Sequence, residues 1–147
     1  MNKNEIRIKK VSERAILPTY GSEWAAGADL YAIPDGDIVI KPHETVFVHT
    51  GIALAIPDGL VGLIYARSGL ACKKGLAPAN KVGVIDSDYR GEIIVALHNH
   101  SEEERTVSSG DRIAQIVFTP YVTADFTECD ELDDTARGTG GFGSTGK

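Results

Sequence analysis

The sequence lacks several features that define whole classes of protein. Its longest apolar runs, such as Ile52–Ile56 and Ile93–Leu97, are five residues long, far short of the roughly 20 that cross a bilayer. Only two cysteines occur, Cys72 and Cys129, and neither belongs to a CxxC pair, which excludes a zinc site of that type. The opening residues hold no apolar block typical of a signal peptide. We therefore expect a cytoplasmic protein with no membrane partner.

Basic residues are too few and too scattered to suit a nucleic acid. The chain has 15 Lys and Arg against 21 Asp and Glu, a formal net charge of −6. The whole acidic surplus lies in segment 125–134, which holds six acids and no base. A nucleic-acid partner would require a basic stripe along the backbone path. We expect no nucleic-acid partner.

The residues that are abundant predict a β fold. Short runs rich in Ile, Val and Tyr recur between turn formers such as 34–37 and 57–59, a spacing that favours an all-β sandwich or barrel. One short helix fits at 68–74, with Ser68 capping its start and Gly75 ending it. Five of the 16 glycines lie between 138 and 146 and predict a mobile tail. We divide the chain into one β domain, 1–134, and a flexible C-terminal lid, 135–147.

Five segments carry side chains unusual for plain sheet turns. They are AGADLYA (26–32), ARSGLA (66–71), NKVGVIDSDYRGEI (80–93), GDRIAQIV (110–117) and ARGTGGFGST (136–145). In order and spacing they resemble the five motifs of the homotrimeric dUTPase family. The resemblance implies a jelly-roll-like all-β fold and a Mg²⁺-dependent enzyme that hydrolyses dUTP to dUMP and diphosphate. This reaction limits uracil incorporation into DNA and supplies dUMP for dTMP synthesis. It also implies self-association as a homotrimer with shared active sites.

Three of these segments offer groups for a triphosphate. Arg67, Ser68 and Gly69 form either a polar turn or a cradle of guanidinium, hydroxyl and amides for phosphate oxygens, and the resemblance implies the cradle. Asp29 is either an edge acid or, by resemblance, the group that contacts Mg²⁺ through water. Gln115 interrupts an apolar run, and a buried amide there needs partners. Those partners are either nearby backbone or, by resemblance, the α-phosphate and the attacking water.

The segment 80–93 offers groups for the nucleoside and the catalytic water. Asp86 is either a solvated turn acid or a carboxylate that orients or deprotonates water, and the resemblance implies the catalytic role and a contact with the 3′-OH. Tyr89 is either a hairpin aromatic or, by resemblance, the ring that leaves no room for a 2′-OH. Backbone groups of this hairpin can present donors and acceptors in a fixed array, and the resemblance implies that they recognise uracil. The matching positions are Asn80, Gly83, Val84 and Ile85.

The glycine-rich tail is either a flexible linker or a lid over the site. The resemblance implies that its arginine and hydroxyls clamp the γ-phosphate while its phenylalanine stacks on uracil. The tail residues expected to bind substrate are Arg137, Phe142, Gly143, Ser144 and Thr145.

Two other functions remain open. A related deaminase would act on dCTP and release ammonia, and the uracil-type hairpin and the Phe142 tail disfavour it. A non-catalytic binding module would retain the nucleotide pocket without turnover. The expected catalytic positions, Asp86 and Gln115, are both filled, which argues against this module.

Overall fold

The computed structural model of the chain describes residues 5–143 and builds its body from antiparallel strands around one hydrophobic core. The strands are Arg7–Lys10 (β1), Thr19–Tyr20 (β2), Ala28–Tyr31 (β3), Ile38–Ile40 (β4), Thr45–Ala55 (β5), Leu60–Tyr65 (β6), Leu76–Pro78 (β7), Gly83–Ile85 (β8), Glu92–Asn99 (β9), Arg105–Val107 (β10) and Arg112–Pro120 (β11). Within the described residues one α-helix occurs, α1, at Ser68–Lys74.

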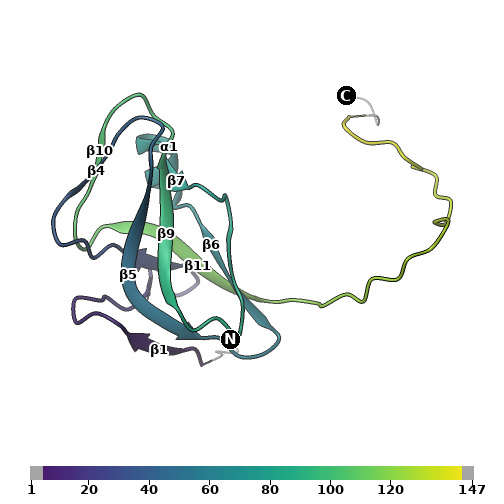
Figure 1. Ribbon diagram of the computed structural model, residues 1–147, viewed down its shortest axis with the longest axis horizontal. Helices are drawn as coiled ribbons and strands as arrows, with labels where there is room; N and C mark the ends of the chain where they lie inside the picture. The colour runs from purple at the N-terminus through teal and green to yellow at the C-terminus, as the bar shows by residue number, and fades with distance from the viewer. Residues whose placement is uncertain (1–4, 144–147) are drawn as a thin grey trace.

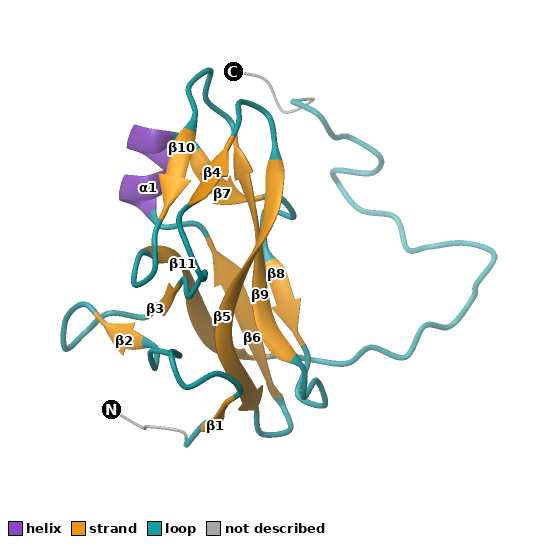
Figure 2. Ribbon diagram, turned by 60° about the vertical axis from the view of Figure 1, so that its left-hand side comes forward, coloured by secondary structure: helices purple, strands orange, loops and turns teal. Residues whose placement is uncertain are grey.

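Two larger sheets form the two layers of the body (Figure 1, Figure 2). One has the strand order β1-β5-β9-β7, the other β2-β3-β11-β6-β8, and β10 and β4 form a small separate pair. Their inward side chains make one core, with Val48 and Leu97 from the first sheet meeting Leu30 and Ile116 from the second. The all-β prediction with one short helix is confirmed. Over residues 5–143 neither sheet closes on itself, so the architecture is a sandwich rather than a barrel.

The helix lies where the sequence predicts it, but its start differs. Gly75 ends it in the left-handed conformation, with φ of 69°, as expected. The prediction that Ser68 caps the start is wrong, because the N-cap residue is Arg67 and no side chain caps the first turn. Arg67 has an extended backbone, and its side chain turns instead toward Asp29. The extended residue between β6 and α1 therefore directs the Arg67 side chain to Asp29 and leaves the first turn of the helix without a side-chain cap.

Strand alternation sends two of the predicted site residues to the outer face of the five-stranded sheet. Leu30 and Ile116 are fully buried in the core, so their neighbours Asp29 and Gln115 point to the opposite face. These two residues are directly paired across β3 and β11, and Gln115 is also paired with Tyr65 of β6. The sheet therefore holds Asp29 and Gln115 side by side.

After Pro120 the chain leaves the sheets and runs away from the body as an extended segment (Figure 1). Its apolar side chains are bare, with Val122 92% and Phe126 97% exposed. Short-range hydrogen bonds, such as the Gly138 amide to the Thr135 carbonyl at 3.0 Å, shape its far end. Among the described residues no helix is long and apolar enough to span a membrane.

Candidate active site

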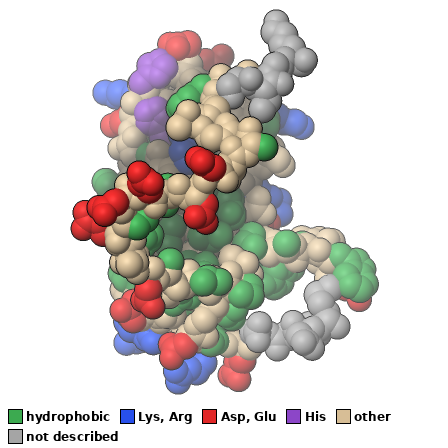
Figure 3. All heavy atoms as spheres, turned by 90° about the vertical axis from the view of Figure 1, so that its right-hand side faces the viewer, with side chains coloured by type: hydrophobic (Ala, Val, Ile, Leu, Met, Phe, Trp, Pro, Cys, Tyr) green, Lys and Arg blue, Asp and Glu red, His purple; other side chains and the backbone are tan. Residues whose placement is uncertain are grey.

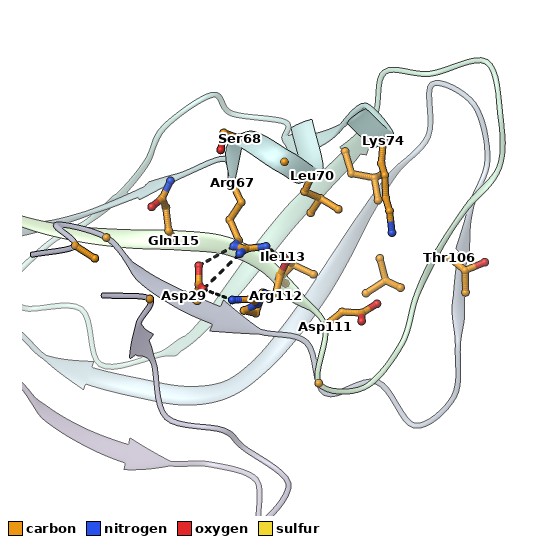
Figure 4. Close-up of a pocket in the computed structure, with 17 residues that line it drawn as sticks. Asp29, Arg67, Ser68, Leu70, Lys74, Thr106, Asp111, Arg112, Ile113 and Gln115 are labelled. Carbon is orange, nitrogen blue, oxygen red and sulfur yellow. Dashed lines mark hydrogen bonds and ion pairs between the residues drawn. The ribbon is translucent and has the colours of Figure 1, made fainter. Parts of the chain in front are cut away.

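A cavity of about 570 Å³ opens beside the start of α1 (Figure 4). We call it the arginine pocket. It is formed by β3, the junction of β6 with α1, and β11, which are far apart in the sequence. All five predicted triphosphate, water and metal residues of the first, second and fourth segments line it. They are Asp29, Arg67, Ser68, Gly69 and Gln115.

One carboxylate organises the charges of the arginine pocket. Asp29 accepts hydrogen bonds from Arg67, with Nε at 2.6 Å and Nη2 at 3.5 Å, and from Arg112, with Nη1 at 3.2 Å. The Asp29 side chain is only 12% exposed, and the two arginines supply the opposite charge and the hydrogen bonds that a mostly buried carboxylate requires. With Lys74 and Asp111, the lining residues include three bases and two acids. This excess of one positive charge suits an anion although the whole chain is acidic.

Arg112 is a site residue that the sequence reasoning missed. Regular alternation along β11 would turn it to the core with Ala114. The pairing with β3 instead shifts register between Arg112 and Ala114, so that Ile113 and Ala114 are both buried and Arg112 faces Asp29. Such a bulge re-aims one side chain. No signal in the strand pattern would have found it, although Arg112 lies within a matched segment.

The half-buried side chain of Gln115 has a fixed orientation in the arginine pocket. Its Nε2 donates to the backbone carbonyl of Ala66 at 2.9 Å, one residue before Arg67. The expectation that this amide needs a partner is confirmed, and the partner in the described structure is backbone. Its contact with a phosphate and a water stays a prediction.

The segment 80–89, which we call the base hairpin, lies at the other side of the same sheet. β8 is the edge strand beside β6, so backbone groups along one side of β8 face away from the sheet. Asn80 and Asp86 are exposed, and in the described part of the chain no hydrogen bond or ion pair engages the Asp86 carboxylate. Gly83, Val84 and Ile85 are the three residues of β8.

Tyr89 has the most defined side chain of the base hairpin. Its hydroxyl donates to the backbone carbonyl of Glu92 at 2.9 Å, and the residue is 44% exposed. The ring lies against Gly91, since a Cβ built on that glycine would be 2.5 Å from the ring atom Cζ. The ring is therefore held in one orientation while one face stays open.

The structure does not bring Asp86 and Arg67 together within one chain. β8 pairs with β6 so that Ile85 faces Gly62 and Gly83 faces Ile64, which places Asp86 at the level of Val61. Arg67 lies six residues further along the chain direction of β6. At roughly 3.3 Å per residue the two positions are about 20 Å apart. A water activated by Asp86 therefore could not reach a phosphate held by Arg67 of the same chain.

The described tail residues, Arg137, Phe142 and Gly143, do not line the arginine pocket. Arg137 donates from Nε to the Gly140 carbonyl at 2.8 Å, within the tail itself. The Phe142 side chain is fully exposed, and both Phe142 and Gly143 have positive φ, 51° and 87°. Ser144 and Thr145 lie outside the described residues.

The open sandwich and the arginine pocket define an all-β protein whose cavity suits an anionic ligand. Comparison with known proteins narrows the class. The family model for dUTPase matches residues 13–146. Relatives named deoxyuridine 5′-triphosphate nucleotidohydrolase are 50% identical to the chain. The relative from Syntrophotalea carbinolica aligns over 141 residues, 96% of both chains, and that from Desulfitobacterium hafniense over 149, 99% of both.

A solved structure agrees. The dUTPase of Staphylococcus bacteriophage 80alpha with dUPNHPP superposes with a TM-score of 0.85 at 27% identity, covering 99% of this chain and 100% of that one. The chain belongs to the dUTPase family.

Proposed function

We propose that this chain hydrolyses dUTP to dUMP and diphosphate with Mg²⁺. The observation that carries the proposal is the Asp29–Arg67–Arg112 triad in the arginine pocket. It lies in a chain whose relatives at 50% identity are named for this reaction. The reaction would limit uracil incorporation into DNA and supply dUMP for dTMP synthesis. The proposal includes a cytoplasmic location, where a reducing environment would keep the exposed thiols of Cys72 and Cys129 reduced.

The arginine pocket binds the triphosphate in this proposal. Asp29 and the Arg112 carbonyl accept three of the five N–H groups of the Arg67 guanidinium, and the other two are left for phosphate oxygens. Ser68 and Gly69 line the same cavity and supply a hydroxyl and backbone amides. Fixed donors stabilise charge without reorganising during the reaction, which is what phosphoryl chemistry requires.

The catalytic water comes from the base hairpin of a second chain. Because Asp86 and Arg67 of one chain are about 20 Å apart by strand register, a complete site needs two chains. Asp86 of one chain deprotonates a water whose oxygen joins the α-phosphorus. The bond from that phosphorus to the bridging oxygen then breaks, and diphosphate leaves. Gln115, beside Arg67, orients the α-phosphate and the water.

An apolar outer face supports self-association as a homotrimer. On the face that carries Gln115, strand alternation also places Leu63, Tyr65, Val84 and Val117. Val84 is 60% and Tyr65 36% exposed, a strong exposure for apolar side chains. Hydrophobic side chains gather in a hollow on the side of the molecule from which the C-terminal segment extends (Figure 3). A second copy would cover such a face and bring its base hairpin with it.

The base hairpin and the tail complete the substrate contacts. Asn80 and the backbone of Gly83–Ile85 recognise uracil, while the Tyr89 ring packs on deoxyribose and excludes a 2′-OH. The C-terminal segment, which contains Arg137 and Phe142, runs away from its own body (Figure 1), and in this proposal it closes over the site of a neighbour. Arg137 with the hydroxyls of Ser144 and Thr145 would hold the γ-phosphate. Closure would exclude water and commit the substrate.

The residues of the arginine pocket fit a Mg²⁺ ion carried by the triphosphate. Over residues 5–143 no group of three or more His, Cys, Asp or Glu side chains is arranged to hold a metal ion alone. Asp29 uses three contacts to two arginines, and a carboxylate has about four acceptor positions. One position is left for a metal-bound water. When bound, Mg²⁺ neutralises phosphate charge and usually keeps several waters.

One assay tests the proposed function. The full chain is incubated with Mg²⁺ and each of dUTP, dTTP, dCTP and UTP, and release of diphosphate and ammonia is followed. We expect diphosphate from dUTP alone, and none when EDTA replaces Mg²⁺. Ammonia from dCTP would establish the deaminase instead. Tight binding of dUTP without diphosphate release would establish a binding module.

A further inference from the structure

We propose that Gly27 is a positioning residue for Gln115. Gly27 lies half-buried in the arginine pocket, one residue before β3. A Cβ built on Gly27 would overlap the Oε1 atom of Gln115, and would lie 3.0 Å from its Cδ and 3.3 Å from its Cβ. The carboxamide of Gln115 therefore occupies the space that a side chain at position 27 would need.

Space, and not backbone conformation, requires a glycine here. Gly27 does not have the positive φ that disfavours other residues, so alanine would be tolerated by the backbone. Other glycines of the same cavity differ, since a Cβ on Gly21 or Gly69 would meet nothing within 4 Å. Among these three, a methyl group at Gly27 alone would strike a predicted site residue.

The carboxamide of Gln115 is enclosed from two sides. The Ala66 carbonyl accepts a hydrogen bond from Nε2 at 2.9 Å, and Gly27 lies against Oε1. The backbone of Gln115 cannot yield, because β11 is paired there with both β3 and β6. A methyl group at Gly27 would therefore displace the end of the side chain, while the sheet and the core stay as they are.

The inference rests on the proposed function, in which Gln115 orients the α-phosphate and the water. A misplacement of about 1 Å can cost roughly 100-fold in rate. We expect Gly27→Ala to lower kcat for dUTP by about that factor, and to lower it as far as Gln115→Ala does. Since the two closest atoms, Oε1 and Cδ, belong to the far end of a flexible side chain, the unfolding temperature should fall by only a small amount.

A double-mutant cycle tests whether Gly27 acts through Gln115. The full chain is compared with Gly27→Ala, Gln115→Ala, the double variant and Gly36→Ala, by kcat, by dUPNHPP affinity and by thermal unfolding. Gly36 lies in a surface turn where a Cβ would meet nothing within 4 Å, and serves as the control. We expect the double variant to equal Gln115→Ala, with Gly36→Ala like the wild type.

Each contrary result has one meaning. Full turnover by Gly27→Ala, or a loss that multiplies with that of Gln115→Ala, would overturn the inference. A wild-type chain that releases no diphosphate would overturn the proposed function instead. In that case the side-chain amide resonances of Gln115 still decide the geometry, since Gly27→Ala should shift them and Gly36→Ala should not.

A separate observation assigns a similar role to Gly91. We infer that Gly91 sets sugar selectivity by leaving room for the Tyr89 ring. A Cβ on Gly91 would overlap the Tyr89 hydroxyl, and would lie 2.5 Å from Cζ and 2.9 Å from Cε2. Gly91 also lacks a positive φ, so the restriction is again one of space. A methyl group would lift the ring and break its hydrogen bond to the Glu92 carbonyl.

The expected effect of Gly91→Ala is on selectivity more than on rate. The ratio of kcat/KM for dUTP to that for UTP should fall about tenfold or more, because a displaced ring no longer fills the space of a 2′-OH. Tyr89→Ala should lower the ratio similarly, and Gly36→Ala should leave it unchanged. A wild-type ratio in Gly91→Ala would overturn the inference. A wild type without selectivity would overturn the role proposed for Tyr89.

Discussion

The arginine pocket and the base hairpin lie on one sheet but are built differently. In the arginine pocket Asp29, Arg67 and Arg112 hold one another, and Gln115 is tied to backbone. In the base hairpin Asp86 and Asn80 project into solvent, and the described structure gives the Asp86 carboxylate no partner. The arginine pocket is thus pre-organised within a chain. In the proposed function, the base hairpin acts only when it faces a second chain.

The largest expected loss of activity comes from a substitution in the base hairpin that leaves the arginine pocket unchanged. Asp86→Asn removes the proposed base, so kcat should fall by about 10² to 10⁴. Affinity for dUPNHPP, measured by calorimetry, should persist because the triphosphate donors remain. Asp88→Asn changes a nearby exposed acid of the same turn and should retain activity. An unchanged kcat in Asp86→Asn would remove Asp86 from the mechanism.

The second largest effect removes the tail and leaves both regions in place. A chain that ends at Thr135 lacks Arg137 and Phe142, whose described contacts are not with the sheets. It should fold, melt and assemble as the full chain does, by circular dichroism and size exclusion, while most dUTP turnover is lost. Full turnover by the truncated chain would sink the role of the tail as a lid.

The third prediction compares the two regions by how much a substitution in each lowers the free energy of unfolding. Asp29→Asn takes the charge from under two arginines in a mostly buried position, so it should lower the free energy of unfolding by about 1–3 kcal/mol. Asp86→Asn, at an exposed position, should not. Asp35→Asn, which breaks an exposed pair with Arg14, is the matched control and should cost under about 1 kcal/mol. Denaturant unfolding measures all three, and equal stability of Asp29→Asn and wild type would contradict the buried triad.

The smallest effect concerns a histidine cluster beside the base hairpin. Burial, then the charges of His98, Lys81 and His43, lower the pKa of His100 from 6.5. Folding therefore disfavours the protonated ring, so a small contribution to stability that is present above pH 6.5 is lost as the pH falls below it. Thermal unfolding should show a smaller drop between pH 7 and pH 5 in His100→Asn than in the wild type. Equal drops would contradict this.

The sequence predicted which residues line the arginine pocket better than it predicted how their side chains are arranged. Asp29, Arg67 and Gln115 follow from matched segments, and strand alternation then puts Asp29 and Gln115 on one face. Arg112 was missed because a bulge, which leaves no clear mark in the apolar pattern, turns it outward. Gly27 was missed for another reason. Its proposed role depends on the space beside its Cα, which the Gln115 side chain fills, and Gln115 belongs to β11, a strand remote in sequence.

The fold was predicted at the level of long strands and of the helix end at Gly75. The strands β2, β7 and β10 hold only two or three residues each, too few to show an alternating pattern in the sequence. The separation of Asp86 from Arg67, about 20 Å by strand register, could not be seen in the sequence either. The order of the motifs predicts which residues a site needs, but the distance between those residues in one chain depends on the pairing register of β8 with β6.

The most direct test of shared sites is complementation between two inactive chains. Arg67→Ala and Asp86→Asn chains are purified separately, then unfolded and refolded together in equal amounts. If each site joins the arginine pocket of one chain to the base hairpin of another, about one interface in four regains both intact halves. The mixture should then recover about a quarter of the wild-type turnover, while each variant refolded alone stays inactive. A mixture as inactive as its components would contradict the account.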